Sequence, residues 1–243
     1  IITTPPNNPY WRNVPIKAYL EKELGIRGFF ENDANCGALA EWLFGAGRGC
    51  NDMIYLTMST GIGAGVIAAG KLVQGKSFLA GEIGHTVQVP GGRLCNCGLR
   101  GCYEAYAGGR AIAQRMHEEL KGLPGHPMLR YASDAKAENL DLMALEKAAR
   151  DGVDYAVKLW DEMCLHNAQA YGALMNIFNP EKIVLGTIAW AAGDFFFDPV
   201  RKYLPEFAWP ETIRDCELVA SELKRDISSY AGIAGALYAL RQR

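Results

Sequence analysis

The sequence lacks any run of about 18 apolar residues, so no membrane-spanning helix is predicted. It also lacks an excess of charge of either sign, because 25 Lys and Arg stand against 27 Asp and Glu and leave a net charge of −2. Such a balance argues against a nucleic-acid or anionic-membrane partner. No signal peptide, internal repeat or low-complexity segment is recognisable, and we expect a cytoplasmic protein.

The 243 residues are 49% hydrophobic, which is enough to bury a large core in one or two domains. The chain opens on Ile1-Ile2-Thr3-Thr4 without a methionine, and we expect the natural protein to be longer. Four of the seven cysteines are scattered in apolar contexts and are predicted to be reduced core thiols: Cys36, Cys50, Cys164 and Cys216.

The other three cysteines, Cys95, Cys97 and Cys102, fall within eight residues, on a loop bent by glycines. His85 stands ten residues before Cys95. Three thiolates and one imidazole form a ligand set that suits a closed, structural zinc site. The alternative is three free or disulfide-bonded cysteines, but a bond between Cys95 and Cys97 would be strained.

Periodicity and turn residues predict a mixed chain, typical of the α/β class. Helices are predicted over 14–24, 36–44, 103–120, 141–151, 154–178 and 227–240, and strands over 27–30, 53–59, 66–69 and 182–186. Small residues in the last helix suggest close packing on a sheet.

A glycine run, Thr60-Gly61-Ile62-Gly63-Ala64-Gly65, separates two predicted strands. A dinucleotide-binding fingerprint would precede a helix, so a hairpin is the simpler interpretation. Consecutive backbone N–H groups in such a turn can bind an anion, and the Thr60 hydroxyl adds a donor. The alternative is a plain turn that needs positive φ.

Carboxylates appear at three further points of the sequence. Asn32 and Asp33 stand at a predicted strand end before a helix, where open α/β sheets bind ligands, although an N-cap role is the alternative. Glu82 and His85 stand three residues apart, so one helical turn aims both the same way. Glu104 follows the last cysteine, and each glutamate could also be an ordinary surface residue.

These elements together resemble the ROK family of repressors and sugar kinases, most of all its glucokinase-like branch. The resemblance is carried, in order along the chain, by Glu31-Asn32-Asp33-Ala34-Asn35, the glycine run, Gly81-Glu82-Ile83-Gly84-His85 and Cys95-Asn96-Cys97-Gly98-Leu99-Arg100-Gly101-Cys102. It extends through Asn179-Pro180-Glu181-Lys182 to the last helix. It implies an actin-like, ribonuclease-H-like fold of two lobes.

The resemblance implies that residues 1–50, completed by the helix 227–243, are the remainder of a small lobe. Residues 51–226 would form the large lobe with its zinc-binding loop 85–102. Family kinases begin with a strand and an Asp-x-Gly-Gly-Thr phosphate loop that helps to place Mg²⁺. This sequence lacks both, so the first lobe is expected to be truncated at its N-terminus.

The implied activity is ATP-dependent phosphorylation of a hexose hydroxyl, at the 6-position, with Asp33 as the general base. The resemblance assigns Asn32, Asp33, Glu82, His85 and Glu104 to the sugar. It assigns Thr60, Gly61, Gly63 and Gly186 to ATP, and His85, Cys95, Cys97 and Cys102 to zinc. Where relatives carry further glycine after Gly186, this sequence has Thr187. A homodimer is expected.

Two other functions stay open at this point. The chain could be the sugar-sensing part of a ROK repressor, or a zinc-stabilised sugar-binding remnant without catalysis. The identity of the hexose is also open, as is the donor, since polyphosphate could replace ATP.

Overall fold

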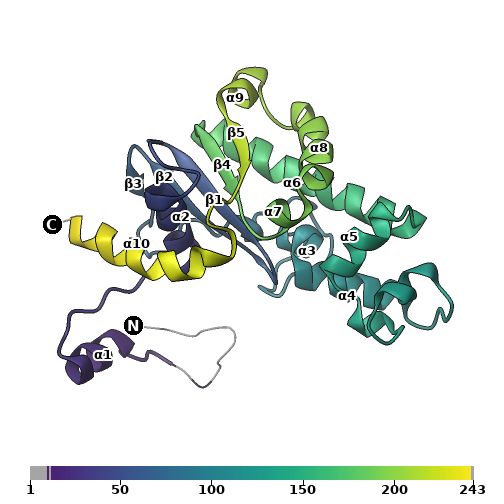
Figure 1. Ribbon diagram of the computed structural model, residues 1–243, viewed down its shortest axis with the longest axis horizontal. Coiled ribbons are helices and arrows are strands. Elements are labelled where there is room, and N and C mark those ends of the chain that lie inside the picture. The colour runs from purple at the N-terminus through teal and green to yellow at the C-terminus, as the bar shows by residue number, and fades with distance from the viewer. Residues whose placement is uncertain (1–9, 11, 242–243) are drawn as a thin grey trace.

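The computed structural model describes residues 10 and 12–241, and a five-stranded mixed sheet lies at its centre (Figure 1). The strand order is β3-β2-β1-β4-β5, with β1 (Met53–Met58), β2 (Ile62–Ala68), β3 (Lys71–Leu72), β4 (Lys182–Leu185) and β5 (Glu217–Ala220). β2 pairs antiparallel with both β1 and β3, whereas β4 runs parallel to β1 and to β5. The antiparallel hairpin is thus extended by two parallel strands, and this mixed sheet agrees with the predicted α/β class.

Helices account for most of the remaining structure, and their bounds are α1 (Ile16–Leu24), α2 (Asp33–Phe44), α3 (Glu104–Ala107), α4 (Gly109–Leu120), α5 (Leu142–Arg150), α6 (Asp154–Phe178), α7 (Ile188–Ala192), α8 (Asp194–Tyr203), α9 (Pro210–Asp215) and α10 (Ile227–Arg241). Single 3-10 turns lie between some of them, of which η1 (Ile83–His85) matters for the site. In the part of the chain that the structure describes, no helix has both the length and the apolar character to cross a membrane.

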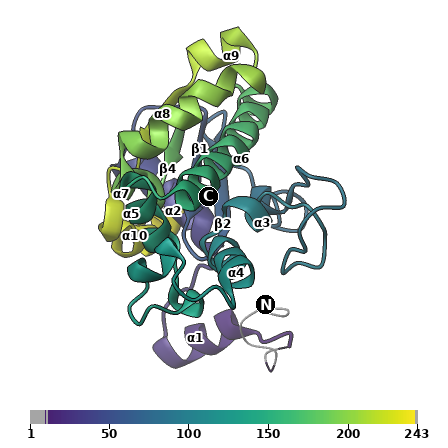
Figure 2. The same ribbon diagram turned by 90° about the vertical axis from the view of Figure 1, so that its right-hand side faces the viewer.

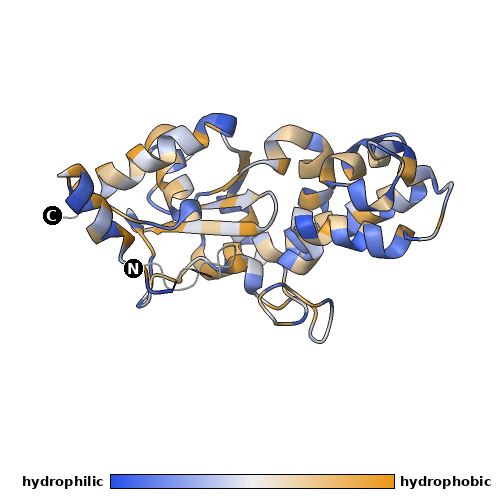
Figure 3. Ribbon diagram, turned by 90° about the horizontal axis from the view of Figure 1, so that it is seen from below, coloured by the Kyte–Doolittle hydropathy of each residue, from blue (hydrophilic) through white to orange (hydrophobic). Residues whose placement is uncertain are grey.

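Alternate residues of β1 face two separate hydrophobic cores. Ile54, Leu56 and Met58 belong to the larger core, which the helices from α4 to α8 share. Met53 and Tyr55 point into a smaller core built with α2 and α10. Because side chains alternate along a strand, this one strand separates two layers of helices. The hydropathy colouring of Figure 3 shows apolar residues along the strands, with hydrophilic residues frequent on the helices farthest from the sheet.

Glycines in β2 allow α2 to lie unusually close to the sheet. A Cβ added to Gly65 would come within 2.6 Å of the Ala38 Cβ, and one added to Gly63 within 3.1 Å of the Ala34 Cβ. The predicted hairpin is therefore confirmed, but its second strand begins at Ile62 rather than at Val66. The glycine run is mostly strand, and only residues 59–61 form the turn.

Several predicted bounds differ from the structure for local reasons. The predicted strand 27–30 is wrong, because these residues belong to no described strand. The predicted helix 103–120 is divided into α3 and α4 by Gly108, whose backbone is extended at ψ 138°. α2 begins three residues early because Asn32 caps it. The elements α7, α8, α9 and β5 were not anticipated at all.

The last helix packs mainly against α2, and it also reaches the sheet, because the Tyr238 hydroxyl accepts a hydrogen bond from the Leu72 N–H of β3 at 2.9 Å (Figure 1). Its Gly235 lies so close to α2 that an added Cβ would be 3.2 Å from the Cys36 Sγ. The described part of the segment 227–243 therefore contacts α2, which lies before residue 50. The boundary between lobes at residue 50 stays a prediction. All seven cysteines are free of disulfides.

Candidate functional site

A cleft of about 510 Å³ opens where five segments of the chain meet. The N-terminus of α2 supplies Asn32 and Asp33, and the turn between β1 and β2 supplies Thr60 and Gly61. The remaining walls come from the segment around η1, the cysteine-rich loop and the first turns of α3 and α4: Gly81, Glu82, His85, Cys95, Cys97, Glu104 and Arg110. Segments distant in sequence therefore share one cavity.

The first turn of α2 places two polar side chains on the cleft. The Asn32 side-chain oxygen accepts hydrogen bonds from the backbone N–H groups of Ala34 at 2.8 Å and Asn35 at 3.2 Å. This is the N-cap arrangement. Asp33 follows as the first helical residue, and its carboxylate accepts from the Ala34 N–H at 2.9 Å. The capping role considered for Asp33 thus belongs mainly to Asn32.

Glu31 fixes this turn from behind. Its carboxylate accepts hydrogen bonds from the Asn32 N–H and from the side chain of buried Asn35, both at 2.9 Å. The Gln74 side chain also donates to it. Glu31 therefore joins the start of α2 to the segment after β3, a link that sequence reasoning missed.

Glu104 joins α3 to the turn between β1 and β2. Its Oε2 accepts a hydrogen bond from the Ile62 N–H at 2.8 Å. A Cβ on Gly61 would lie 2.5 Å from the same oxygen, so a larger residue at position 61 would displace the Glu104 carboxylate. The predicted phosphate-binding residues Thr60, Gly61 and Gly63 consequently line the same cleft as the predicted sugar ligands.

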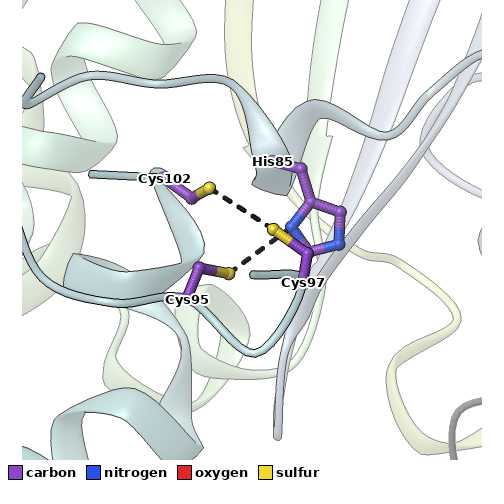
Figure 4. A group of neighbouring side chains, drawn as sticks. All are labelled: His85, Cys95, Cys97 and Cys102. Atoms are coloured by element: carbon purple, nitrogen blue, oxygen red, sulfur yellow. Dashed lines mark hydrogen bonds between the residues drawn. The ribbon is translucent and has the colours of Figure 1, made fainter. Parts of the chain in front are cut away.

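The three clustered thiols and His85 come together as the sequence predicted (Figure 4). One ligand atom from each lies within 4.8 Å of all the others. The Cys95 Sγ is 3.7 Å from the His85 Nδ1, and the Cys97 and Cys102 Sγ atoms are also 3.7 Å apart. Tetrahedral zinc with ordinary bond lengths separates its ligands by about 3.5 to 3.8 Å. The donor set therefore fits a zinc ion, and these two separations match its tetrahedral geometry.

The loop that carries the thiols depends on left-handed glycines. Gly98 has φ 91° and Gly101 has φ 85°, values that L side chains rarely adopt. The next residue after the loop, Tyr103, is fully buried and donates a hydrogen bond to the Asn167 side chain of α6. In Figure 2 the segment leading to α3 extends away from the helices, so this anchor fixes its base.

The local environment sets the protonation of the three thiols. Burial raises the pKa of Cys102 to about 12 and also raises the pKa of Cys95. A backbone hydrogen bond from Leu99 lowers the pKa of exposed Cys97. Three neighbouring thiolates repel one another, so a bound divalent cation is what would keep all of them deprotonated.

His85 has one ring nitrogen for each side of the site. Its Nδ1 faces the sulfur atoms, while its Nε2 lies 4.0 Å from the Glu82 Oε2. The 3-10 turn η1 produces this arrangement, and Gly84 within it packs so closely that a Cβ would be 2.6 Å from the Ile62 oxygen. A metal held by Nδ1 would leave Nε2 directed away from the sulfur atoms.

Gly186 is separate from this group, because it does not line the cleft. It directly follows β4, and its N–H donates to the Leu56 oxygen at 2.8 Å. The next residue, Thr187, has φ 37° and ψ −89°, an unusual conformation for a β-branched residue. The structure thus brings Thr60, Gly61 and Gly63 to Asp33 but leaves Gly186 elsewhere.

Sequence reasoning missed several residues that line the cleft, namely Ser59, Asn96, Arg110 and Gln114. Arg110 stands out chemically because the other charged side chains named there, apart from His85, are carboxylates. The sequence offered one indication of its role, namely its position near the start of a predicted helix, six residues after Glu104.

The family relationship follows from comparison with known proteins. The model of the ROK family matches residues 1–243. The chain belongs to the ROK family. A glucokinase of Thermotoga maritima is 39% identical over 243 residues, which are all of this chain and 75% of that protein. The predicted relationship to glucokinase-like sugar kinases is thereby confirmed, as is the enzyme class of sugar kinase.

Structures and regulators of the same family complete the comparison. A Streptomyces griseus ROK glucokinase, solved with glucose and AMPPNP, is 33% identical with a TM-score of 0.77, covering 98% of this chain and 75% of that one. The predicted actin-like kinase fold is confirmed by this similarity. A xylose repressor of Caldicellulosiruptor bescii is 30% identical over 89% of this chain and 54% of its own length. The family therefore includes both kinases and regulators related to this chain.

Proposed function

We propose that the chain phosphorylates a hexose hydroxyl, at the 6-position, with ATP as the donor and Asp33 as the general base. One observation carries the proposal: Asp33, Glu82 and Glu104 line a single cleft together with the turn at Thr60. The related glucokinase solved with glucose and AMPPNP supports the choice of sugar and donor.

The chemistry suits these residues. A hexose is uncharged and offers only hydroxyls, so recognition needs several acceptors and donors that converge from different directions. Asn32, Glu82, Glu104 and the Nε2 of His85 are assigned to the sugar on this basis. The Asp33 carboxylate would accept the proton of the attacking hydroxyl as the new bond to phosphorus forms.

The donor side of the cleft is assigned to Thr60, Gly61 and Gly63. Phosphoryl transfer depends mainly on positioning and on stabilising charge, and backbone N–H groups with one hydroxyl serve both purposes. ATP with Mg²⁺ supplies the phosphoryl group. Gly186 is assigned to the nucleotide beyond the cleft, on the family resemblance alone.

Zinc is proposed as a structural ion held by His85, Cys95, Cys97 and Cys102. Four protein ligands leave no open position for a metal-bound water, so its contribution is to the fold of the loop. The same loop leads directly into Glu104. His85 would bind the ion through Nδ1 while its ring also lines the cleft. Loss of the metal should therefore disturb sugar binding.

The direct test is a panel of hexoses incubated with ATP and, separately, with polyphosphate, followed by detection of sugar phosphate. Asp33→Asn should lower turnover by about 100- to 10,000-fold and leave sugar affinity near normal. Asp154→Asn is the matched control, because Asp154 is also the first residue of a helix. Turnover that survives Asp33→Asn would place the base elsewhere.

The relatedness to the xylose repressor favours one second candidate, the sugar-sensing part of a ROK regulator. A third is a sugar-binding remnant without catalysis. Binding of a sugar without phosphorylation would support either, and retention of DNA by a longer form of the protein would single out the regulator. The homodimer, the cytoplasmic location and the division into lobes complete the proposal.

A further inference from the structure

We propose that Arg110 binds the terminal phosphates of the phosphoryl donor, a role that rests on the proposed function. Among the described residues that line the cleft, Arg110 is the only lysine or arginine. Arg110 is exposed, and its guanidinium makes no hydrogen bond or ion pair with any side chain of residues 10 and 12–241. An exposed, unpaired arginine on a cleft otherwise rich in carboxylates is available for an anion.

The backbone holds Arg110 next to the predicted phosphate-binding turn. Its N–H donates to the Thr60 oxygen at 2.9 Å, and the N–H of Gly109 donates to the Ser59 oxygen at 2.9 Å. Gly109 approaches so closely that a Cβ there would lie 2.3 Å from the Ser59 oxygen. The first turn of α4 and the turn between β1 and β2 thus form one unit.

Charge explains why this unit would need a cation. Asp33, Glu82 and Glu104 place three carboxylates on the cleft, and a triphosphate brings several further negative charges. A guanidinium can donate two parallel hydrogen bonds to phosphate oxygens, and it stays charged at every physiological pH. In phosphoryl-transfer enzymes an arginine in such a place stabilises the charge on the transferred group.

Two other uses of Arg110 are less consistent with its placement. A structural arginine would pair with a carboxylate, as Arg115 of the same helix does with Glu119 at 2.8 Å and Glu162 at 2.7 Å. Arg110 has no such pair in the described part of the chain. A role at the sugar hydroxyls would place Arg110 on the segment that carries Asp33, whereas its backbone N–H is bonded to Thr60, in the turn assigned to the phosphates.

The experiment measures binding of inorganic tripolyphosphate and of glucose to the full chain by calorimetry. Arg110→Gln should weaken tripolyphosphate binding by about 10-fold or more, and Arg110→Lys by less, with glucose affinity unchanged. Arg214→Gln removes an equal charge from α9, outside the cleft, and should change neither affinity. The salt dependence of tripolyphosphate binding should also become shallower in Arg110→Gln.

Equal tripolyphosphate affinity in wild type and Arg110→Gln would overturn the inference, as would a wild type that binds no tripolyphosphate. A loss of glucose affinity instead of tripolyphosphate affinity would also overturn it, by placing Arg110 at the sugar. The proposed function fails separately. If Arg110 governs tripolyphosphate binding but no hexose is phosphorylated, the assignment of Arg110 stands and the kinase proposal does not.

Discussion

Replacing Gly65 by alanine should separate α2 from the sheet and disturb the cleft at the same time. The added Cβ would lie 2.6 Å from the Ala38 Cβ, 2.9 Å from the Ala34 oxygen and 3.0 Å from the Asn35 Cα. Carbon atoms in contact prefer about 3.5 to 4.0 Å, so α2 must retreat by about 1 Å. Two of the three atoms are backbone, and no rotamer change can relieve the contact.

The expected cost is that of overpacking a core. Such insertions destabilise by about 1–3 kcal/mol, and the gain from removing a strand glycine returns less than about 1 kcal/mol. For a chain of 243 residues a net loss near 2 kcal/mol lowers the melting temperature by about 4–8 °C. Because α2 carries Asp33 at its first turn, a shift of this size should also reduce turnover, by up to about 100-fold.

Thermal and urea denaturation followed by circular dichroism would measure the loss. Gly232→Ala is the control, since an added Cβ on that α10 glycine meets nothing within 4 Å and alanine favours a helix. It should raise stability by about 0.5–1 kcal/mol. If Gly65→Ala melts at the wild-type temperature with full activity, the close contact between α2 and β2 does not exist in solution.

Three further changes have defined outcomes. Cys97→Ala should release zinc, measured by mass spectrometry of the bound metal, and weaken sugar binding; unaltered affinity in metal-free protein would show that the ion does not shape the cleft. Thr187→Gly should raise the unfolding free energy by about 1 kcal/mol, because φ 37° is unfavourable for threonine; a decrease in urea midpoint would contradict this reasoning. Burial lowers the pKa of His166, so the unfolded chain binds protons first as pH falls and stability should decrease below about pH 6.5. His166→Gln should flatten that decrease, and identical pH profiles would exclude this residue as the cause.

Much of the fold could be predicted where the signals are local. The helix ending at Leu24 stops at left-handed Gly25, and α6 ends before Pro180, as their sequences indicate. The region 187–220 could not be predicted, because its helices are short and β5 has only four residues. The strand character of Gly63 and Gly65 also escaped prediction, since it comes from their pairing with Thr57 and Tyr55 of β1.

The candidate site shows the same distinction between local and long-range information. The metal ligands have a spacing that predicts their chemistry, and the structure brings all four together. Arg110 has no motif around it, and only its hydrogen bond to Thr60, fifty residues earlier, places it on the cleft. Residues whose meaning depends on such contacts need coordinates to be recognised.

The four predicted zinc ligands differ in their access to solvent, since Cys95 and Cys102 are buried whereas Cys97 is exposed. One edge of the coordination sphere is therefore reachable without opening the core. Ligand exchange with a competing chelator can begin by attack at that edge, and an alkylating reagent should modify Cys97 ahead of its two neighbours. The kinetics of metal loss would then be governed by a single outward-facing sulfur rather than by global unfolding.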